Sequence, residues 1–282
     1  MLKKKLIYIM VGIVAFAYFV YFQNNSIVTS KTVIRSADIP NGFHQYKIVH
    51  LSDLHSKNFG RDQQILVRKV SQLKPNIIVF TGDLIDSNRV GDEASLILMK
   101  ELTTIVPVYY VSGNHEWWSG TFSSLESSLN DLGVRVLRNE HDVVDKGNDK
   151  MYIVGIDDPA HGSKSLTERE RTEDVIVESI EGIEKDSFTI LLSHRPEMLD
   201  LYAASGFDIV FAGHAHGGQV RIPFIGGLVA PNQGFFPTYT AGKHELNQTV
   251  MVVSRGLGNS IIPLRLFNRP EIVEITLEVL DS

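Results

Sequence analysis

Side chains able to bind metal ions gather in five short clusters of this 282-residue chain. Nearly every cluster lies where an apolar run gives way to a polar turn, and in order they are Asp53-Leu54-His55, Gly82-Asp83 with Asp86, Gly113-Asn114-His115, Ser193-His194 and Gly213-His214-Ala215-His216-Gly217-Gly218. Carboxylate, carboxamide and imidazole groups suit divalent ions such as Mn, Fe and Zn. Two such ions side by side can activate water and stabilise an in-line displacement at phosphorus. The residue types therefore favour a metal-dependent phosphoesterase.

Each cluster alone also has an ordinary structural explanation. Asp53 could simply cap a turn after a strand, and Asn114 is a residue that accepts a left-handed backbone. The pair His214 and His216 is stronger evidence, because alternate residues of an extended segment point the same way and could bind adjacent ions. The ordered set of all five clusters is what supports the prediction.

Strands and helices alternate through the first half of the chain. Apolar runs predict strands near 31–36 and over 46–51, 76–81 and 107–111, and amphipathic patterns predict helices over 65–73, 92–104 and 122–132. Thr167 and Glu170 form a capping-box pattern that predicts a further helix.

The second half contains more strand than helix. Strands expected over 187–192 and 208–212 end just before His194 and His214, and the pattern after Gln219 is mostly β. In open α/β sheets, binding sites gather beyond the carboxyl ends of strands, which is where these clusters fall. The alternation predicts mixed sheets covered by helices.

The N-terminus carries a basic segment and then an apolar one. Lys3, Lys4 and Lys5 precede Leu6–Phe22, a run of 17 residues without a charge. That length fits a short spanning helix or the core of a signal peptide. No small-x-small cleavage site directly follows the run, so an uncleaved anchor is favoured. The lysines would stay in the cytoplasm, which places the rest of the chain outside it.

Composition limits the other possibilities. Hydrophobic residues make up 43% and charged residues 21%, which fits a folded domain with a large core. The clusters draw on both halves of the chain, so we expect residues 1–23 as an anchor or uncleaved signal, 24–40 as a polar tether and 41–282 as one catalytic domain. The net charge of −6 gives no reason to expect a nucleic-acid partner, and the absence of cysteine excludes disulfides.

The ordered signature resembles that of the calcineurin-like metallophosphoesterases. It runs from Asp53 to His216 as Asp-x-His, Gly-Asp-x-x-Asp, Gly-Asn-His-Glu, His and Gly-His-x-His, with every motif residue present. The tail through Val279 also resembles a bacterial branch with an N-terminal membrane segment, whose members include envelope UDP-diacylglucosamine pyrophosphohydrolases and cell-wall-associated phosphatases. The resemblance implies an α/β (α+β) fold, a four-layer αββα sandwich of two mixed sheets, behind a single transmembrane helix.

The resemblance also implies a dinuclear metal centre. Its ligands would be Asp53, His55 and His216 for one ion, Asn114, His194 and His214 for the other, and Asp83 bridging the two. A hydroxide shared by the ions would attack phosphorus. His115 would protonate the leaving group as general acid, with Asp86 fixing its orientation. Two divalent ions, Mn, Fe or Zn in preference to Mg, are the expected cofactors.

Other residues have two interpretations each. Arg195 and Arg221 could contact a substrate phosphate or could be ordinary charged residues. The apolar loop 222–231 and the segment 235–237 could be core strands and their turns. They could also form an apolar lip that accepts an acyl chain or touches a bilayer.

The leading hypothesis is therefore a membrane-anchored phosphoesterase on the extracytoplasmic side. It would hydrolyse a phosphodiester, pyrophosphate or phosphomonoester of an envelope or lipid-linked substrate, with no nucleic acid and no obligate protein partner expected. Two alternatives stay open. One is a non-catalytic exported metal-binding module, and the other is a phosphatase facing the cytosol that acts on proteins or nucleotides.

Overall fold

Two mixed β-sheets form the centre of the molecule. The computed structural model describes residues 2–89, 91–162, 165–259 and 264–280, and these residues include two six-stranded sheets. The first sheet contains, in spatial order, β1 (Val28–Ser36), β16 (Glu271–Val279), β2 (Lys47–Leu51), β3 (Ile77–Thr81), β4 (Val108–Val111) and β5 (Arg135–Val136). The second contains β14 (Gly242–Leu246), β15 (Thr249–Val253), β9 (Ile209–Ala212), β8 (Thr189–Leu192), β7 (Asp149–Gly155) and β6 (Glu140–Lys146).

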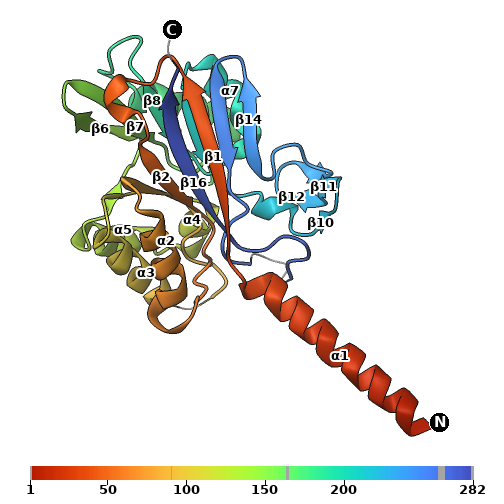
Figure 1. Cartoon of the computed structure of the whole chain (residues 1–282). Helices are drawn as coiled ribbons and strands as arrows, with labels where there is room; N and C mark the ends of the chain where they lie inside the picture. The colour runs from red at the N-terminus through yellow and green to blue at the C-terminus, as the bar shows by residue number, and fades with distance from the viewer. Residues whose placement is uncertain (1, 90, 163–164, 260–263, 281–282) are drawn as a thin grey trace.

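Helices cover the outer faces of both sheets. The first sheet is covered by α2 (Gln64–Leu73), α3 (Glu93–Thr103) and α5 (Phe122–Asp131), and α4 (Asn114–Ser119) lies at its edge. The second sheet is covered by α6 (Glu168–Ser179) and α7 (Leu199–Ala204). The capping box predicted at Thr167 and Glu170 is present at the start of α6. The four layers seen in Figure 1 confirm the predicted αββα sandwich.

The apolar core has three layers, as this architecture requires. Between the sheets, Val79 and Tyr109 from the first pack with Ile190 and Phe211 from the second. The alternate residues of the same strands face the helices, since successive side chains on a strand point to opposite faces. Strands β3, β4, β8 and β9 are buried along their whole length, which explains why they appear in the sequence as unbroken apolar runs.

The N-terminal region differs from the expected polar tether. Helix α1 (Leu2–Asn25) extends from the domain (Figure 1), and Ser26 and Ile27 connect it to β1. Strand β1 pairs in parallel with β16 along nine residues, from Val28 with Glu271 to Ser36 with Val279. Most of the segment 24–40 is thus part of the sheet. The strand predicted near 31–36 is present but starts earlier, at Val28, where polar side chains are found because β1 lies at a sheet edge and one of its faces meets solvent.

Two small hairpins follow the last predicted ligand, His216. Their strands are β10 (Arg221–Ile222) with β11 (Gly226–Gly227), and β12 (Val229–Ala230) with β13 (Gly234–Phe235). Both hairpins project from the edge of the second sheet (Figure 1). Ala230 is buried, whereas Phe224 and Phe235 are exposed. The apolar loop therefore contains both core and surface positions.

Candidate metal centre

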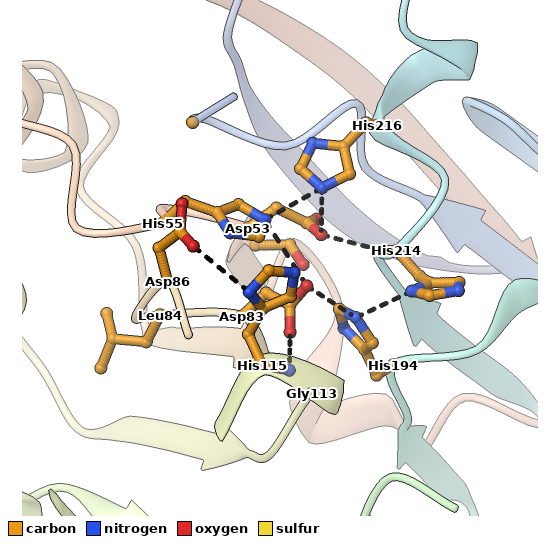
Figure 2. Close-up of polar contacts among 12 residues, drawn as sticks. Asp53, His55, Asp83, Leu84, Asp86, Gly113, His115, His194, His214 and His216 are labelled. Atoms are coloured by element: carbon orange, nitrogen blue, oxygen red, sulfur yellow. Dashed lines mark hydrogen bonds and ion pairs between the residues drawn. The ribbon is translucent and has the colours of Figure 1, made fainter. Parts of the chain in front are cut away.

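Five strand ends deliver the predicted ligands to one place. The connections are β2 to Asp53 and His55, β3 to Asp83, β4 to Asn114, β8 to His194, and β9 to His214 and His216. Three of these strands belong to the first sheet and two to the second. Parallel strands end at the same edge of a sheet, so the packing of two sheets brings residues 53 and 216 together. Figure 2 shows the resulting cluster.

Asp83 lies at the centre of this cluster. Its Oδ2 is 3.5 Å from His55 Nε2 and 3.3 Å from His194 Nε2, so a single carboxylate oxygen faces imidazoles from two different sheets. Its Oδ1 accepts a hydrogen bond of 2.9 Å from the backbone N–H of His115. This bond fixes the carboxylate plane and leaves Oδ2 directed between the two imidazoles (Figure 2).

Two groups of ligand atoms lie on opposite sides of Asp83. On one side, His216 Nε2 is 3.0 Å from His55 Nε2 and 3.4 Å from Asp53 Oδ1. On the other side, His214 Nδ1 is 3.2 Å from His194 Nε2. Asp83 belongs to both groups, and within each group the possible ligand atoms lie within 4.8 Å of one another.

The unsatisfied atoms of the cluster fit cations. Asp53 Oδ2 and Asn114 Oδ1 are buried and have no hydrogen-bond partner among the described residues. Buried acceptors of this kind are rare in folded proteins, because an unpaired polar atom costs about 1–3 kcal/mol. His194 Nδ1 lies 2.7 Å from the Thr81 carbonyl, so it donates its proton there and leaves the Nε2 lone pair for a ligand bond.

The backbone at the cluster is strained. Five of the seven predicted ligands have φ in the left-handed region, and these are Asp53 (53°), His55 (50°), Asp83 (52°), His214 (64°) and His216 (47°). This region costs a residue with a side chain of the order of 1–3 kcal/mol and persists where the surrounding structure imposes it. Such clustering of strain is typical of functional sites.

Two glycines are required by space rather than by backbone freedom. A Cβ at Gly113 would collide with Asp83 Oδ1, and a Cβ at Gly213 would collide with Ser52 Oγ. Neither glycine has a positive φ. Close packing against Asp83 and Ser52, rather than a left-handed backbone, therefore requires glycine at these two positions.

Glu116 is a site residue that the sequence did not identify. Its buried carboxylate accepts backbone hydrogen bonds from Asp83 (2.8 Å), Ile85 (3.1 Å) and Gly113 (2.7 Å). These bonds fasten the loop after β3 to the start of α4. Burial and, to a smaller extent, the nearby Asp83 carboxylate together raise the pKa of Glu116 to about 7, although the backbone donors Ile85 and Gly113 lower it. The motif Gly-Asn-His-Glu contained the residue, but its partners are 31 and 33 positions away.

The electrostatics of the cluster favour imidazoles that can act as ligands. Burial lowers the pKa of His55 to about 3 and lowers the pKa values of His214 and His216 well below the usual range. Burial also lowers the pKa of His194, but the carboxylates of Asp83 and Asp53 outweigh it and raise the value to about 10. A proton and a metal ion compete for the same lone pair of an imidazole nitrogen. The negative charges of Asp83 and Asp53 therefore attract either kind of cation to His194.

His115 lies beside the cluster and is held from one side. The backbone N–H of Ser87 donates to its Nδ1 at 3.1 Å, which leaves the proton of the neutral ring on Nε2. Asp86 Oδ1 is 3.6 Å from Nδ1, beyond hydrogen-bond distance, and this oxygen accepts the N–H of Asn88. Ser87 therefore contacts the ring more closely than Asp86, the partner expected from the sequence.

The two arginines considered as substrate contacts differ in exposure. Arg195 is 2% exposed and forms a two-pronged ion pair with Asp158, at 2.5 and 2.9 Å, while its Nη1 lies 3.3 Å from His214 Nε2. Arg221 is partly exposed and donates to the Gly217 carbonyl at 2.9 Å.

Comparison with known proteins gives the class of this site. The family model of the calcineurin-like phosphoesterases matches residues 46–218. The chain therefore belongs to this family, and it is a metallophosphoesterase, a hydrolase of phosphoester bonds.

Three relatives extend the comparison beyond the matched region. The chain is 30% identical over 268 residues to the metallophosphoesterase YkuE of Bacillus subtilis, covering 93% of this chain and 90% of the relative. It is 30% identical over 252 residues to a transmembrane protein with metallophosphoesterase domain from Bos taurus, covering 85% and 54%. It is 27% identical over 239 residues to the phosphodiesterase YaeI of Escherichia coli, covering 82% of each.

Proposed function

We propose that this metallophosphoesterase uses two divalent ions to hydrolyse an envelope or lipid-linked phosphoester. Asp53, His55 and His216 would hold one ion, Asn114, His194 and His214 the other, and Asp83 both. The observation that supports this assignment is the position of Asp83 Oδ2, 3.5 Å from His55 Nε2 and 3.3 Å from His194 Nε2, with a ligand group on either side. Mn, Fe or Zn suits this mixture of carboxylate, amide and imidazole better than Mg.

The bound ions would lower the pKa of coordinated water and neutralise charge on the phosphoryl oxygens. The chain's own residues do the remaining work. His115 holds its proton on Nε2 because Ser87 occupies Nδ1, so this ring donates a proton to the departing oxygen. Asp86 organises the loop that carries Ser87, through its bonds to Asn88 and Arg89.

The two arginines take different roles in this proposal. Arg221 is close to the loop of His216 and partly exposed, so it contacts a substrate oxyanion. Arg195 is buried against Asp158, and its nearest polar neighbour in the cluster is the His214 ring. We infer that Arg195 positions His214 and does not reach the substrate.

The membrane assignment rests on α1. The helix Lys3–Asn25 is long and apolar enough to cross a bilayer, and only 6% of its most apolar stretch is buried against the domain. One relative is named a transmembrane protein, which supports an anchor. We propose that α1 crosses the membrane once, with Lys3, Lys4 and Lys5 in the cytoplasm and the catalytic domain outside. A reporter fused after residue 282 that is active only in the cytoplasm would contradict this topology.

Activity assays on the full chain in detergent test the chemistry. The substrates are bis-p-nitrophenyl phosphate, p-nitrophenyl phosphate and a lipid pyrophosphate, each with Mn, Zn, Mg or a chelator. We expect turnover that the chelator abolishes and that Asp83→Asn removes, while the exposed Asp62→Asn leaves it intact. Metal binding without turnover of any substrate would indicate a non-catalytic metal-binding module. The relative named a phosphodiesterase leads us to expect diester hydrolysis first.

A further inference from the structure

Helix α1 is fastened to the catalytic domain at its C-terminal end. Lys57 Nζ donates to the Asn24 carbonyl at 2.5 Å, and Arg269 Nε donates to the Ser26 carbonyl at 2.8 Å. The Asn24 side chain accepts from Asn259 and from the backbone of Arg265, at 3.0 and 3.1 Å. Cations at the carbonyl end of a helix are stabilising. With β1 starting two residues later, the direction of α1 relative to the domain is fixed by these contacts.

The catalytic domain also contacts the side of α1, through Phe267. The rings of Phe19 and Phe267 lie 5.8 Å apart in an edge-on contact. Phe19 is three residues inside the apolar run that ends at Phe22, which corresponds to about 4.5 Å along a helix axis. If α1 spans a bilayer, Phe267 lies at the level of the apolar layer. Tyr18 and Tyr21 project from the same stretch of helix, as expected for an interfacial aromatic belt.

The apolar tip of the first hairpin is a neighbour of Phe267. The backbone N–H of Arg221 donates to the Leu266 carbonyl at 3.0 Å, and Phe267 lines a hollow of about 310 Å³ together with residues 221–226. At the first tip, Phe224 is fully exposed and Ile225 is 66% exposed. In Figure 1 the hairpins lie on the side of the domain from which α1 leaves.

The second hairpin continues this apolar surface. Phe235 is 77% and Phe236 63% exposed, and Phe236 donates its backbone N–H to Leu228 between the two hairpins. Single exposed apolar residues are ordinary on a protein surface, but several large ones on two successive hairpins mark an interaction surface. We call Phe224, Ile225, Phe235, Phe236 and Phe267 the apolar rim.

We propose that the apolar rim inserts into the same bilayer that α1 crosses and seats the catalytic domain on the membrane surface. We expect lipid to contact this surface, because the Phe19–Phe267 contact joins the rim to the membrane helix α1. The hydrogen bonds at the end of α1, such as that from Lys57 to Asn24, hold the helix and the rim in a fixed arrangement. This proposal rests on the proposed function only in that α1 crosses the membrane, and it does not depend on catalysis.

Insertion of the apolar rim would also bring the metal centre close to the membrane surface, which limits the class of substrate. The first hairpin follows His216 in the chain, with its first strand starting at Arg221, and Leu228 donates its backbone N–H to the Gly218 carbonyl at 3.1 Å. Asn268, next to Phe267, donates to the His216 carbonyl at 2.7 Å. His216 is therefore bonded to the residue adjacent to the rim residue Phe267, so a phosphoester on a lipid at the bilayer surface is the class of substrate that the metal centre would meet.

Insertion depth can be measured directly because the chain contains no cysteine. Single-cysteine variants of the full chain, Phe224→Cys and Phe235→Cys, are labelled with bimane and reconstituted into phosphatidylethanolamine–phosphatidylglycerol vesicles with or without bromine on the acyl chains. Phe16→Cys, within α1, is the positive control. Val177→Cys on α6, 70% exposed and outside the rim, is the matched negative control.

We expect brominated lipid to quench the labels at residues 16, 224 and 235 at least twofold and to leave residue 177 unchanged. Labels at 224 and 235 that behave like the label at 177 would overturn the proposal, whether the true occupant is a protein or the acyl chain of a substrate. Quenching at the rim in a protein without phosphoesterase activity would overturn the proposed function and leave the membrane seating intact.

Discussion

Replacing Glu116 with alanine removes the clamp that holds the central carboxylate in place. The Glu116 side chain accepts three backbone N–H groups, those of Asp83, Ile85 and Gly113. Alanine would leave all three buried without an acceptor. Each costs about 1–3 kcal/mol, so the loss is about 3–9 kcal/mol before any compensation.

Part of this loss is offset, because the buried carboxylate is itself unfavourable. Its pKa is raised from 4.5 to about 7, which corresponds to ~3 kcal/mol against the charged form at neutral pH. Water entering the space left by the side chain would satisfy part of what remains. The two contributions differ by about 0–6 kcal/mol, so we expect a net loss of ~3 kcal/mol, or ~6 °C in the melting temperature of a chain of this size.

Thermal unfolding of the metal-free full chain in detergent measures this loss. Glu126→Ala is the matched control, since Glu126 forms a surface ion pair with Arg138 at 3.0 Å and its removal should change the melting temperature by less than ~2 °C. After reloading, Glu116→Ala should also bind metal 10- to 100-fold more weakly, because Asp83 is no longer oriented. An unchanged melting temperature together with unchanged metal affinity would refute the role given to Glu116.

Two further substitutions test other parts of the site. His115→Ala should retain both ions and lose about 10²–10⁴-fold in turnover, as expected for a general acid, when metal content and kcat are measured on the same sample; loss of metal would instead make His115 a ligand. Asp158→Asn should lower the stability by about 3 kcal/mol, since it removes the two-pronged partner of the buried Arg195 guanidinium and leaves only Glu168 and Glu197, each at 3.7 Å. The control is Asp200→Asn, which removes the exposed partner of Arg169 and should leave the melting temperature unchanged. If both substitutions changed the melting temperature equally, the stabilising role given to the Asp158–Arg195 pair would be contradicted.

The gathering of these side chains could be predicted from sequence because strand ends and residue type are both local features. Asp53, Asp83 and His214 each follow a buried apolar run, and the structure places all three at strand ends in one cluster. Their left-handed backbone was not predictable, because aspartate and histidine accept that conformation more readily than most residues but do not require it. It is imposed by long-range bonds such as that from the His214 N–H to Asp53 Oδ1, across 161 positions.

What the sequence missed depends on contacts between distant segments. Helix α4 has six residues, and Gly113, which precedes its first residue, has no side chain to cap it. Its start is stabilised instead by the Glu116 carboxylate, which also binds the loop after β3. The first residues of β1 were assigned to the tether because its partner β16 lies more than 240 positions away, and this pairing cannot be inferred from the alternation of nine residues.

The central claim is that Asp83 stands between two cations. Elemental analysis of the full chain, stripped with chelator and reloaded with Mn or Zn, tests it most directly when wild type and Asp83→Asn are compared. We predict about two ions bound per wild-type chain and a marked loss of both in the variant. Trace metal in the wild type, or two ions retained by Asp83→Asn, would contradict the account.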